Sequence, residues 1–303
     1  MKTRKTIVGL GELLWDLLPT GERLGGAPAN FTVMAARLGN RGTIASGLGA
    51  DARGERAVRQ LRRFPVDLEY VQTISGQSTG TVGVEFKDGE PRYVIHKPAA
   101  WDFLQWTSEW QELAAQADAV CFSTLGQREP ASRATMQHFL AATRPDCVRV
   151  LDVNLRPPFF SADVVAKSLA MATIFKLNEA ELPQALAMLG APEPVDMQAA
   201  ARWLLEKYPL KLVAITLGAE GSLLVTREAA HRRNGIAGNI ADTVGAGDAF
   251  TAALVDAYLR GASLATMNEA GNRWGAWVAS QRGAMPDLDE ATLKTIQQAI
   301  GAA

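Results

Sequence analysis

Residues 242–250 read DTVGAGDAF, and the second aspartate of this run, Asp248, is a candidate for proton transfer. The stretch that follows is spaced like a helix, so Gly245, Ala246, Gly247 and Asp248 would present consecutive N–H groups at a helix N-terminus. Such a terminus binds anions through partial charge and donor geometry. An ordinary helix cap needs only one Asp or Ser. A carboxylate beside an anion site instead suits the acceptance of a proton from a hydroxyl group that attacks phosphorus.

Further polar residues follow the apolar run VRVLDVNL at residues 148–155. Asp152, Asn154 and Arg156 are spaced two residues apart, and side chains at that spacing share one face of a strand. A turn with a local Asp–Arg pair would also explain them. Three polar side chains converging at a strand end favour a ligand site.

Two later segments allow both a structural and a functional interpretation. In KLNEAEL, Asn178 is followed three residues later by Glu181, which fits a capping box or a carboxylate near Mg²⁺-bound phosphates, since Mg²⁺ prefers oxygen ligands. In TLGAEGSLLV, a plain hairpin explains Gly218 and Gly221. Together with a phosphate site, Thr216 and Gly218 would contact a nucleotide.

Near the N-terminus, GGAPAN (residues 25–30) predicts a helix start with Pro in the first turn. Gly25 and Gly26 also lack side chains that would keep a ligand from the main chain. Asn30 would lie one turn into the helix and face the same region. Asp16, among large apolar residues, is either an exposed strand residue or an acceptor for sugar hydroxyl groups.

The elements that position these residues follow from hydrophobic patterning. Apolar runs of strand length alternate with helical patterns, and continuous rather than alternating apolar character is typical of parallel strands covered on both faces. We therefore predict a doubly wound, mostly parallel α/β sheet with helices on both faces. The predicted strands are TIVGL (6–10), TIASGL (43–48), DAVCFSTLG (118–126), VRVLDVNL (148–155), TIFKLN (173–178) and LVAITLG (212–218).

Residues 12–25 and 78–97 interrupt this rhythm with short alternating strands, and KDGEPR supplies a turn. We predict a small β-lid inserted into one domain that spans residues 1–303. The C-terminal third is expected to be helical.

Composition excludes several classes of protein. The 303 residues carry 31 Lys and Arg against 32 Asp and Glu, so a nucleic-acid or anionic-membrane partner is not expected. Cys121 and Cys147 lie in apolar runs and are predicted to be buried thiols, and the three histidines lack metal-ligand spacing. Glu12 and Asp16 interrupt the apolar N-terminal run, which argues against a signal peptide and favours a cytoplasmic protein.

The motifs GGAPANFTVMAARLG, DVNLRP, KLNEAEL, TLGAEG and DTVGAGDAF, in this order, resemble those of the ribokinase-like carbohydrate kinases, or PfkB family, over essentially the full chain. The resemblance implies a ribokinase-like fold and ATP-dependent, Mg²⁺-assisted phosphorylation of a sugar hydroxymethyl group. It also implies a β-lid over the sugar, through which family members often pair as dimers.

The resemblance assigns roles to the candidate residues. Asp248 would be the base, Gly245, Ala246 and Gly247 the anion hole, and Arg156 an arginine near the acceptor and the phosphates. Nucleotide and Mg²⁺ contacts would come from Asn178, Glu181 (to Mg²⁺ through water), Thr216, Gly218 and Gly221, and sugar contacts from Asp16, Gly25, Gly26, Asn30 and Asn154.

Many family members also bind a monovalent cation such as K⁺ beside the anion hole. The backbone carbonyls at the corresponding places in this sequence belong to Asp242, Val244, Val278, Gln281 and Gly283.

The overall pattern is closest to fructokinases, because GELLWDLLP, GGAPAN and DVNLRP match and Ala27 replaces the lysine of the ribokinase-type loop. Fructose is the expected substrate. A kinase for 2-keto-3-deoxygluconate, another sugar or a nucleoside is the alternative, with Arg92, Lys97 and Arg156 available to a sugar carboxylate. A regulator that binds sugar or nucleotide without turnover is a second alternative. GLGELL (9–14) lacks the third glycine of a dinucleotide-binding loop.

Overall fold

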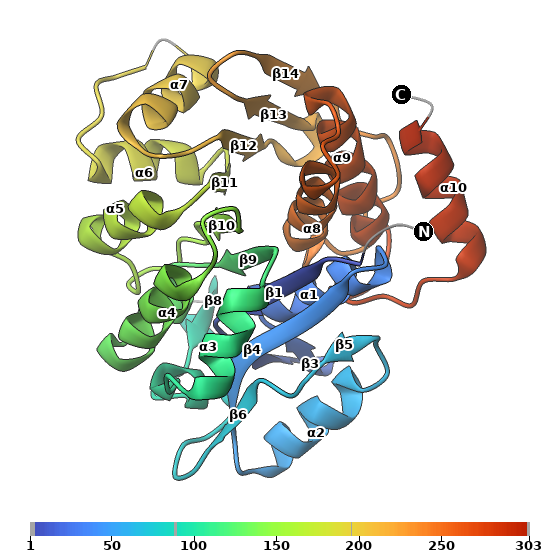
Figure 1. Cartoon of the computed structure of the whole chain (residues 1–303). Coiled ribbons are helices and arrows are strands. Elements are labelled where there is room, and N and C mark those ends of the chain that lie inside the picture. Colours follow the sequence, from blue (N-terminus) through green and yellow to red (C-terminus); the bar gives the residue numbers. More distant parts are fainter. Residues whose placement is uncertain (1–3, 88–89, 195, 302–303) are drawn as a thin grey trace. The chain divides into compact units, whose positions relative to one another are not determined.

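The computed structural model describes residues 4–87, 90–194 and 196–301, and the chain separates into two units, Met1–Pro145 and Asp146–Ala303. Figure 1 labels their helices and strands.

The first unit contains a parallel sheet in the order β9-β1-β4-β5, with β6 also paired to β4. Its central strand β1 is buried along nearly its whole length, as its continuous apolar run predicts. The strands are β1 (Thr6–Leu10), β4 (Arg41–Gly49), β5 (Val66–Asp67), β6 (Val71–Ile74) and β9 (Ala119–Phe122).

Helix α1 lies against β1 and β4, and α3 packs on α4 across the sheet from α1 (Figure 1). Glycines let α1 approach closely, because a Cβ at Gly9 would be 2.2 Å from the Pro28 carbonyl oxygen and a Cβ at Gly42 would be 2.6 Å from that of Thr32. The helical segments of this unit are α1 (Ala27–Arg37), α2 (Ala52–Leu61), α3 (Ser108–Gln116), α4 (Pro130–Ala142) and the short 3₁₀ turns η1 (Ala100–Phe103) and η2 (Leu125–Gln127).

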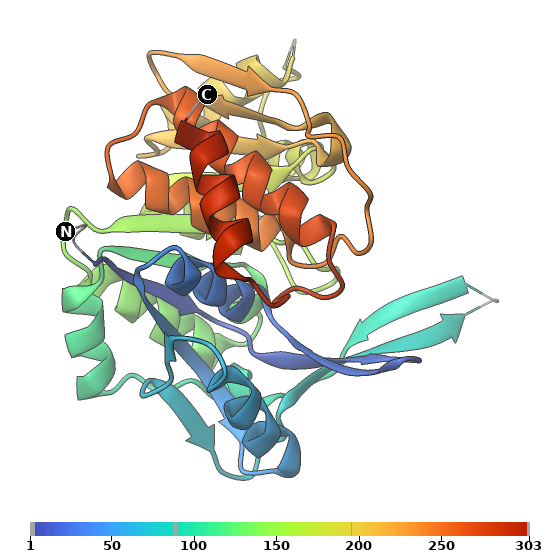
Figure 2. The same cartoon turned by 90° about the vertical axis from the view of Figure 1, so that its right-hand side faces the viewer.

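A second sheet of the first unit has the order β3-β2-β7-β8 and extends away from that unit's helices (Figure 2). It consists of β2 (Leu14–Leu18), β3 (Gly21–Gly25), β7 (Gly80–Lys87) and β8 (Glu90–Ile95), which come from the two stretches predicted to form short strands. Strands β2 and β7 are parallel and the other pairs antiparallel. The tip of the predicted KDGEPR turn, Asp88–Gly89, lies outside the described residues.

A buried ion pair holds the chain where it leaves this second sheet. The Arg128 guanidinium donates to both carboxylate oxygens of Asp102 at 2.8 and 2.7 Å, and also to the His96 carbonyl at 2.8 Å, directly after β8. It stacks 3.9 Å from the ring centroid of Trp101. The Arg128 side chain is 1% exposed and that of Asp102 is 0% exposed, so loss of either charge would leave the other buried without a counter-charge.

The second unit has three parallel strands followed by an antiparallel hairpin, in the order β10-β11-β12-β13-β14. Helices α5, α6 and α7 cover one face of this sheet, and α8 and α9 cover the other (Figure 1). The strands are β10 (Val148–Asp152), β11 (Ile174–Asn178), β12 (Leu212–Thr216), β13 (Ser222–Val225) and β14 (Ala230–Arg233). The helical segments are α5 (Ala162–Met171), α6 (Glu181–Met188), α7 (Met197–Lys207), η3 (Gly218–Glu220), α8 (Ala246–Leu259), α9 (Leu264–Ala279) and α10 (Glu290–Gly301).

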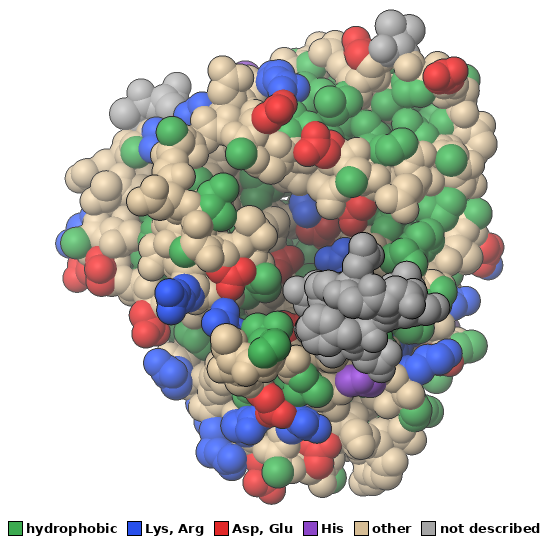
Figure 3. All heavy atoms as spheres, turned by 180° about the vertical axis from the view of Figure 1, so that it is seen from behind, with side chains coloured by type: hydrophobic (Ala, Val, Ile, Leu, Met, Phe, Trp, Pro, Cys, Tyr) green, Lys and Arg blue, Asp and Glu red, His purple; other side chains and the backbone are tan. Residues whose placement is uncertain are grey.

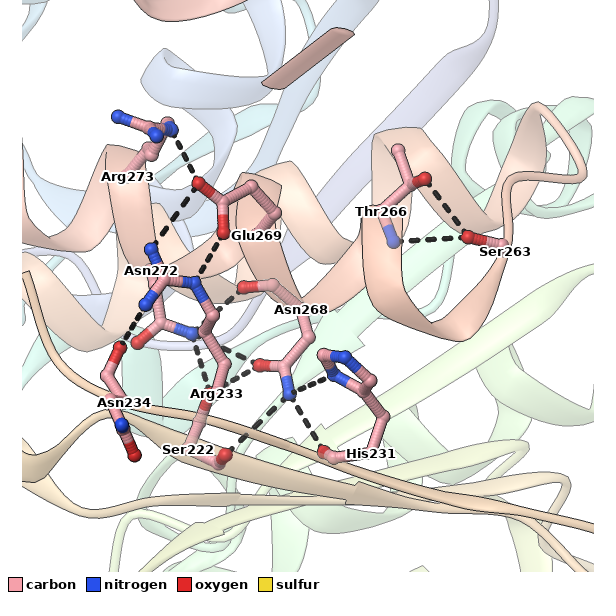
Figure 4. Close-up of polar contacts among 10 residues, drawn as sticks. All are labelled: Ser222, His231, Arg233, Asn234, Ser263, Thr266, Asn268, Glu269, Asn272 and Arg273. Carbon is pink, nitrogen blue, oxygen red and sulfur yellow. Dashed lines mark hydrogen bonds and ion pairs between the residues drawn. The ribbon is translucent and has the colours of Figure 1, made fainter. Parts of the chain in front are cut away.

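A polar network fastens α9 to the β13–β14 hairpin (Figure 4). Asn268 donates to the His231 carbonyl at 2.8 Å and contacts the Ser222 hydroxyl. Asn272 donates to the same hydroxyl at 2.6 Å. The buried carboxylate of Glu269, the residue after Asn268, is paired with Arg233 and Arg273.

The strands predicted from apolar runs are all present, although those predicted at residues 118–126, 148–155 and 212–218 end earlier than predicted. Cys121 and Cys147 are buried thiols, as predicted. Lys, Arg, Asp and Glu side chains are interspersed on the face shown in Figure 3. Among the helices that the structure describes, none is both long and apolar enough to cross a membrane.

The Asp102–Arg128 pair gives a stability prediction. Asp102→Asn would leave a buried guanidinium without its counter-charge, and we expect the free energy of unfolding to fall by about 3–5 kcal/mol. Urea denaturation measures it. The matched control is Asp163→Asn, because Asp163 forms an exposed pair with Lys167 at 2.9 Å and its loss should cost under about 1 kcal/mol. Equal losses in the two variants would contradict the prediction.

Glu269 gives a pH-dependent prediction. Burial alone would raise its pKa, but the hydrogen bond and charge of Arg233 and the charge of Arg273 outweigh burial and lower the pKa from 4.5. The stability that this carboxylate contributes is therefore present above about pH 4.5 and lost as the pH falls through its folded-state pKa.

We expect Glu269→Gln to cost about 1–3 kcal/mol of unfolding free energy at pH 7. The difference from the unsubstituted chain should narrow as the pH is lowered below 4.5. Urea titrations at pH 7, 5 and 4 measure the effect. Glu290→Gln is the control at pH 7, since Glu290 is 80% exposed beside Lys294 and exposed pairs contribute little. A constant difference between pH 7 and 4 would refute the linkage.

Candidate active site

Helix α8 begins at Ala246, with Gly245 as its N-cap residue in the left-handed region at φ 79°. A Cβ at Gly245 would lie 2.5 Å from the Ala284 Cβ, so both the backbone conformation and the packing require glycine. Asp248 is consequently the third residue of the helix and not its cap. Its half-buried carboxylate lies in the first turn, where the helix dipole favours negative charge.

The first turn of a helix has N–H groups without intrahelical acceptors. The Ala246 N–H is satisfied from outside the helix, because it donates to the Thr243 carbonyl at 3.2 Å. Of the predicted anion-binding amides, those of Gly247 and Asp248 belong to this first turn.

Strands β10 and β11 pair Asp152, the last residue of β10, with Lys176 in the middle of β11. The Lys176 ammonium lies 3.1 and 3.0 Å from the two carboxylate oxygens of Asp152. The Thr251 hydroxyl lies within hydrogen-bond distance of both Asp152 Oδ2 (3.2 Å) and the Gly247 carbonyl (2.8 Å), and its one proton can serve either. One carboxylate thus joins β10, β11 and the first turns of α8.

Lys176 is a charged side chain at a buried position. Burial alone would lower the pKa of its ammonium, but the charges of Asp152, Glu181 and Asp248 and the hydrogen bond with Asp152 outweigh burial. Its pKa is raised above 10.5, so the group is an ammonium at neutral pH.

The loop after β11 contains the predicted reciprocal capping. The Asn178 amide oxygen accepts the N–H groups of Ala180 and Glu181 at 2.9 Å, and Glu181 Oε2 accepts the Asn178 N–H at 2.9 Å. The other oxygen, Oε1, accepts the N–H of Leu155 at 3.0 Å. The capping interpretation is confirmed, and Glu181 also ties the ends of β10 and β11 together.

Asn178 lies opposite Thr216 in the register of β11 and β12. The Glu179 N–H donates to the Thr216 carbonyl at 3.0 Å, which joins the two strand ends. Beyond Thr216, the chain turns through Gly218 (φ 57°) and Gly221 (φ 97°) into β13. The hairpin interpretation is confirmed, because β12 and β13 are antiparallel. The structure therefore brings all the predicted nucleotide contacts to one edge of the sheet.

The prediction that Asp152, Asn154 and Arg156 share one strand face is wrong. Strand β10 ends at Asp152, and Asn154 adopts a left-handed φ of 44° that breaks the alternation of side chains. Asp152 is buried with Lys176. Arg156 is exposed and donates to the Leu155 carbonyl at 3.3 Å.

Asp242 joins the two loops that were predicted to supply cation ligands. Its carboxylate accepts the N–H of Val244 and that of Gly283, each at 3.1 Å. The N–H groups of Ala241 and Asp242 both donate to the Ala279 carbonyl, directly after Val278. Within the described residues, no group of three His, Cys, Asp or Glu side chains could hold a metal ion.

The predicted sugar contacts Asp16, Gly25, Gly26 and Asn30 lie in the first unit. Asp16 is half-buried on β2, and a Cβ at Gly25 would lie 2.8 Å from its carboxylate, so the glycine makes room for that carboxylate. Gly26 is the N-cap of α1 at φ 110°, and its carbonyl accepts the N–H of the buried Asn30 at 3.0 Å.

Three polar residues at or near the predicted sites, Lys176, Thr251 and Glu12, were not predicted from the sequence to take part in a site. Glu12 is buried, and the Ser123 hydroxyl donates to it at 3.1 Å. The available signal for Lys176 was a charged residue inside an apolar strand, since buried charges require a partner.

Known proteins resemble this chain over most of its length. A fructokinase of Salmonella typhimurium is 32% identical over 259 residues, which is 81% of this chain and 82% of the relative. The crystal structure of the sugar kinase PH1459 of Pyrococcus horikoshii in complex with ATP matches at 26% identity and a TM-score of 0.80, over 97% of this chain and 98% of that one. A Vibrio cholerae fructokinase bound to fructose, ADP and calcium matches at 25% identity and a TM-score of 0.80, over 96% and 98%.

These similarities confirm the predicted ribokinase-like α/β fold. The sequence model of the pfkB family carbohydrate kinases matches residues 19–291, which is most of the chain. The predicted activity of an ATP-dependent carbohydrate kinase is confirmed, without the identity of the sugar. The chain belongs to the pfkB family of carbohydrate kinases.

Proposed function

We propose that this protein is a fructokinase that transfers the γ-phosphoryl group of ATP to a primary hydroxyl group of fructose. The observation that carries the proposal is the start of α8, where Asp248 lies in the first turn behind the left-handed Gly245. The fructokinase relatives and the ATP-bound structure support the choice of both substrates.

In the proposed reaction, the Asp248 carboxylate accepts the proton of the attacking hydroxyl group. The amides of Gly247 and Asp248 and the dipole of α8 stabilise negative charge on the phosphoryl oxygens. Since little covalent chemistry is left to the protein in phosphoryl transfer, positioning and electrostatics supply the acceleration.

Asn178, Glu181, Thr216, Gly218 and Gly221 would bind the nucleotide. The oxygen donors of this set fit Mg²⁺, which neutralises phosphate charge when bound. Both Glu181 oxygens already accept backbone N–H groups, so we propose that Glu181 reaches Mg²⁺ through water.

The sugar contacts stay predictions and are Asp16, Gly25, Gly26, Asn30, Asn154 and Arg156. Arg156 is exposed and could equally meet a sugar carboxylate, which keeps 2-keto-3-deoxygluconate as the second candidate. We also predict that a K⁺ ion binds at the loops joined by Asp242. A further prediction is that two chains pair through the β3-β2-β7-β8 sheet.

The base assignment predicts the behaviour of Asp248→Asn. We expect kcat to fall by about 10²–10⁴-fold, because a positioned base is lost, while ATP affinity changes little. A coupled ADP-release assay and calorimetric ATP titration measure the two quantities. Asp256→Asn is the control, because Asp256 lies later on the same helix and is paired with Arg260. Turnover near the unsubstituted level in Asp248→Asn would exclude this base.

The substrate assignment predicts the highest kcat/KM for fructose in a panel that also contains ribose, tagatose, 2-keto-3-deoxygluconate and nucleosides. The same ADP-release assay ranks them. A preference for the sugar acid that Arg156→Gln abolishes would replace fructose by the second candidate. ATP binding without turnover of any panel member would contradict a kinase acting on these sugars.

A further inference from the structure

We propose that Lys176 is a positioning residue for phosphoryl transfer, whose buried ammonium holds the first turn of α8 in place and offsets the negative charge of the surrounding carboxylates. The inference rests on the proposed function, since it assigns a role at the same site. Lys176 is not one of the predicted nucleotide or sugar contacts, and it would act through its neighbours.

The first observation is the place of the ammonium. A Cβ at Gly247 would lie 3.1 Å from Lys176 Nζ, so the ammonium packs directly under the backbone of this turn. A side chain at residue 247 would be in tight contact with the ammonium, and the ammonium would have to give way by a few tenths of an ångström. Gly245 is required by its backbone conformation and by Ala284, whereas Gly247 lies in close contact with Lys176.

The second observation is that one ion pair connects three elements. Lys176 comes from β11, its partner Asp152 ends β10, and Thr251 of α8 lies 3.2 Å from the same carboxylate. Thr251 also reaches the Gly247 carbonyl at 2.8 Å. A shift of the ammonium would therefore be transmitted to the turn that carries Asp248.

The third observation concerns energetics. Lys176 lies within the buried part of β11, at a position where neighbouring residues are apolar. Replacement of a buried ion pair by apolar residues of similar volume is often neutral or stabilising. Folding stability alone therefore does not explain why a charge pair stands here.

The fourth observation is the charge of the surroundings. Asp152, which contacts the ammonium, and also Glu181 and Asp248 interact electrostatically with Lys176, so one ammonium offsets the negative charge of three carboxylates. A triphosphate carries several negative charges, and three uncompensated carboxylates would repel it. The Lys176 charge reduces that repulsion at the place where negative charge develops during transfer.

The test separates the charge from its structural contribution. Lys176→Met alone leaves Asp152 buried without a counter-charge, so a loss of activity could reflect misfolding. The decisive variant combines Lys176→Met with Asp152→Asn, which removes both charges and keeps similar volumes and an acceptor for Thr251. The matched control removes an ion pair later on α8, Arg260→Met with Asp256→Asn.

We expect the double variant to regain the urea midpoint of the unsubstituted chain, while kcat remains about 10- to 100-fold lower, since small displacements of positioning groups cost up to about 10²-fold. The dissociation constant for ATP and the KM for the sugar should change much less than kcat, as for an interaction that matters in the transition state. The control pair should leave kcat unchanged.

A stable double variant with the kcat of the unsubstituted chain would overturn the inference, because Lys176 would then serve only to neutralise Asp152. An equal fall of kcat in the control pair would overturn it too. The assay uses the sugar on which the unsubstituted enzyme turns over fastest. Failure of fructose in that panel therefore contradicts the proposed function without affecting the test of Lys176.

Discussion

The buried pair of Lys176 and Asp152 is the interaction on which the second unit's candidate site depends. A buried charge is tolerated only with a partner and further hydrogen bonds, and here the partners come from β10, β11 and α8. Two parallel strands and the helix α8 are thus held at one point. The Glu181 carboxylate adds a second connection, since it accepts the N–H of Leu155 in the loop after β10 and that of Asn178 at the end of β11.

Close backbone approach is the other constraint, and it recurs in both units. In the first unit, Gly9 and Gly42 let α1 lie against β1 and β4. In the second unit, Gly245 packs on Ala284 and Gly247 on Lys176. The two glycines of the 242–250 segment therefore differ in their surroundings, with a left-handed backbone and tight packing at Gly245 and a close buried ammonium at Gly247.

Prediction from the sequence succeeded where a local pattern determines the structure. Continuous apolar runs located the parallel strands, and the three-residue spacing of Asn178 and Glu181 predicted their reciprocal hydrogen bonds. Prediction failed where a single backbone angle decides the direction of the following side chains. At Asn154, a left-handed φ ends the alternation of side chains that was assumed for a strand. Prediction also missed Lys176, because periodicity marks the residue as part of a strand and says nothing of a partner 24 residues earlier.

The capping groups of the second unit limit how a metal ion could be held there. Both Glu181 oxygens and the Asn178 amide oxygen accept backbone N–H groups. A metal ion bound directly to either side chain would compete with these hydrogen bonds and loosen the ends of β10 and β11. Mg²⁺ gives up its water reluctantly, so an ion that keeps its water between itself and Glu181 leaves the strand ends intact. The same carboxylate can then fix the strand ends and orient the water of a bound ion.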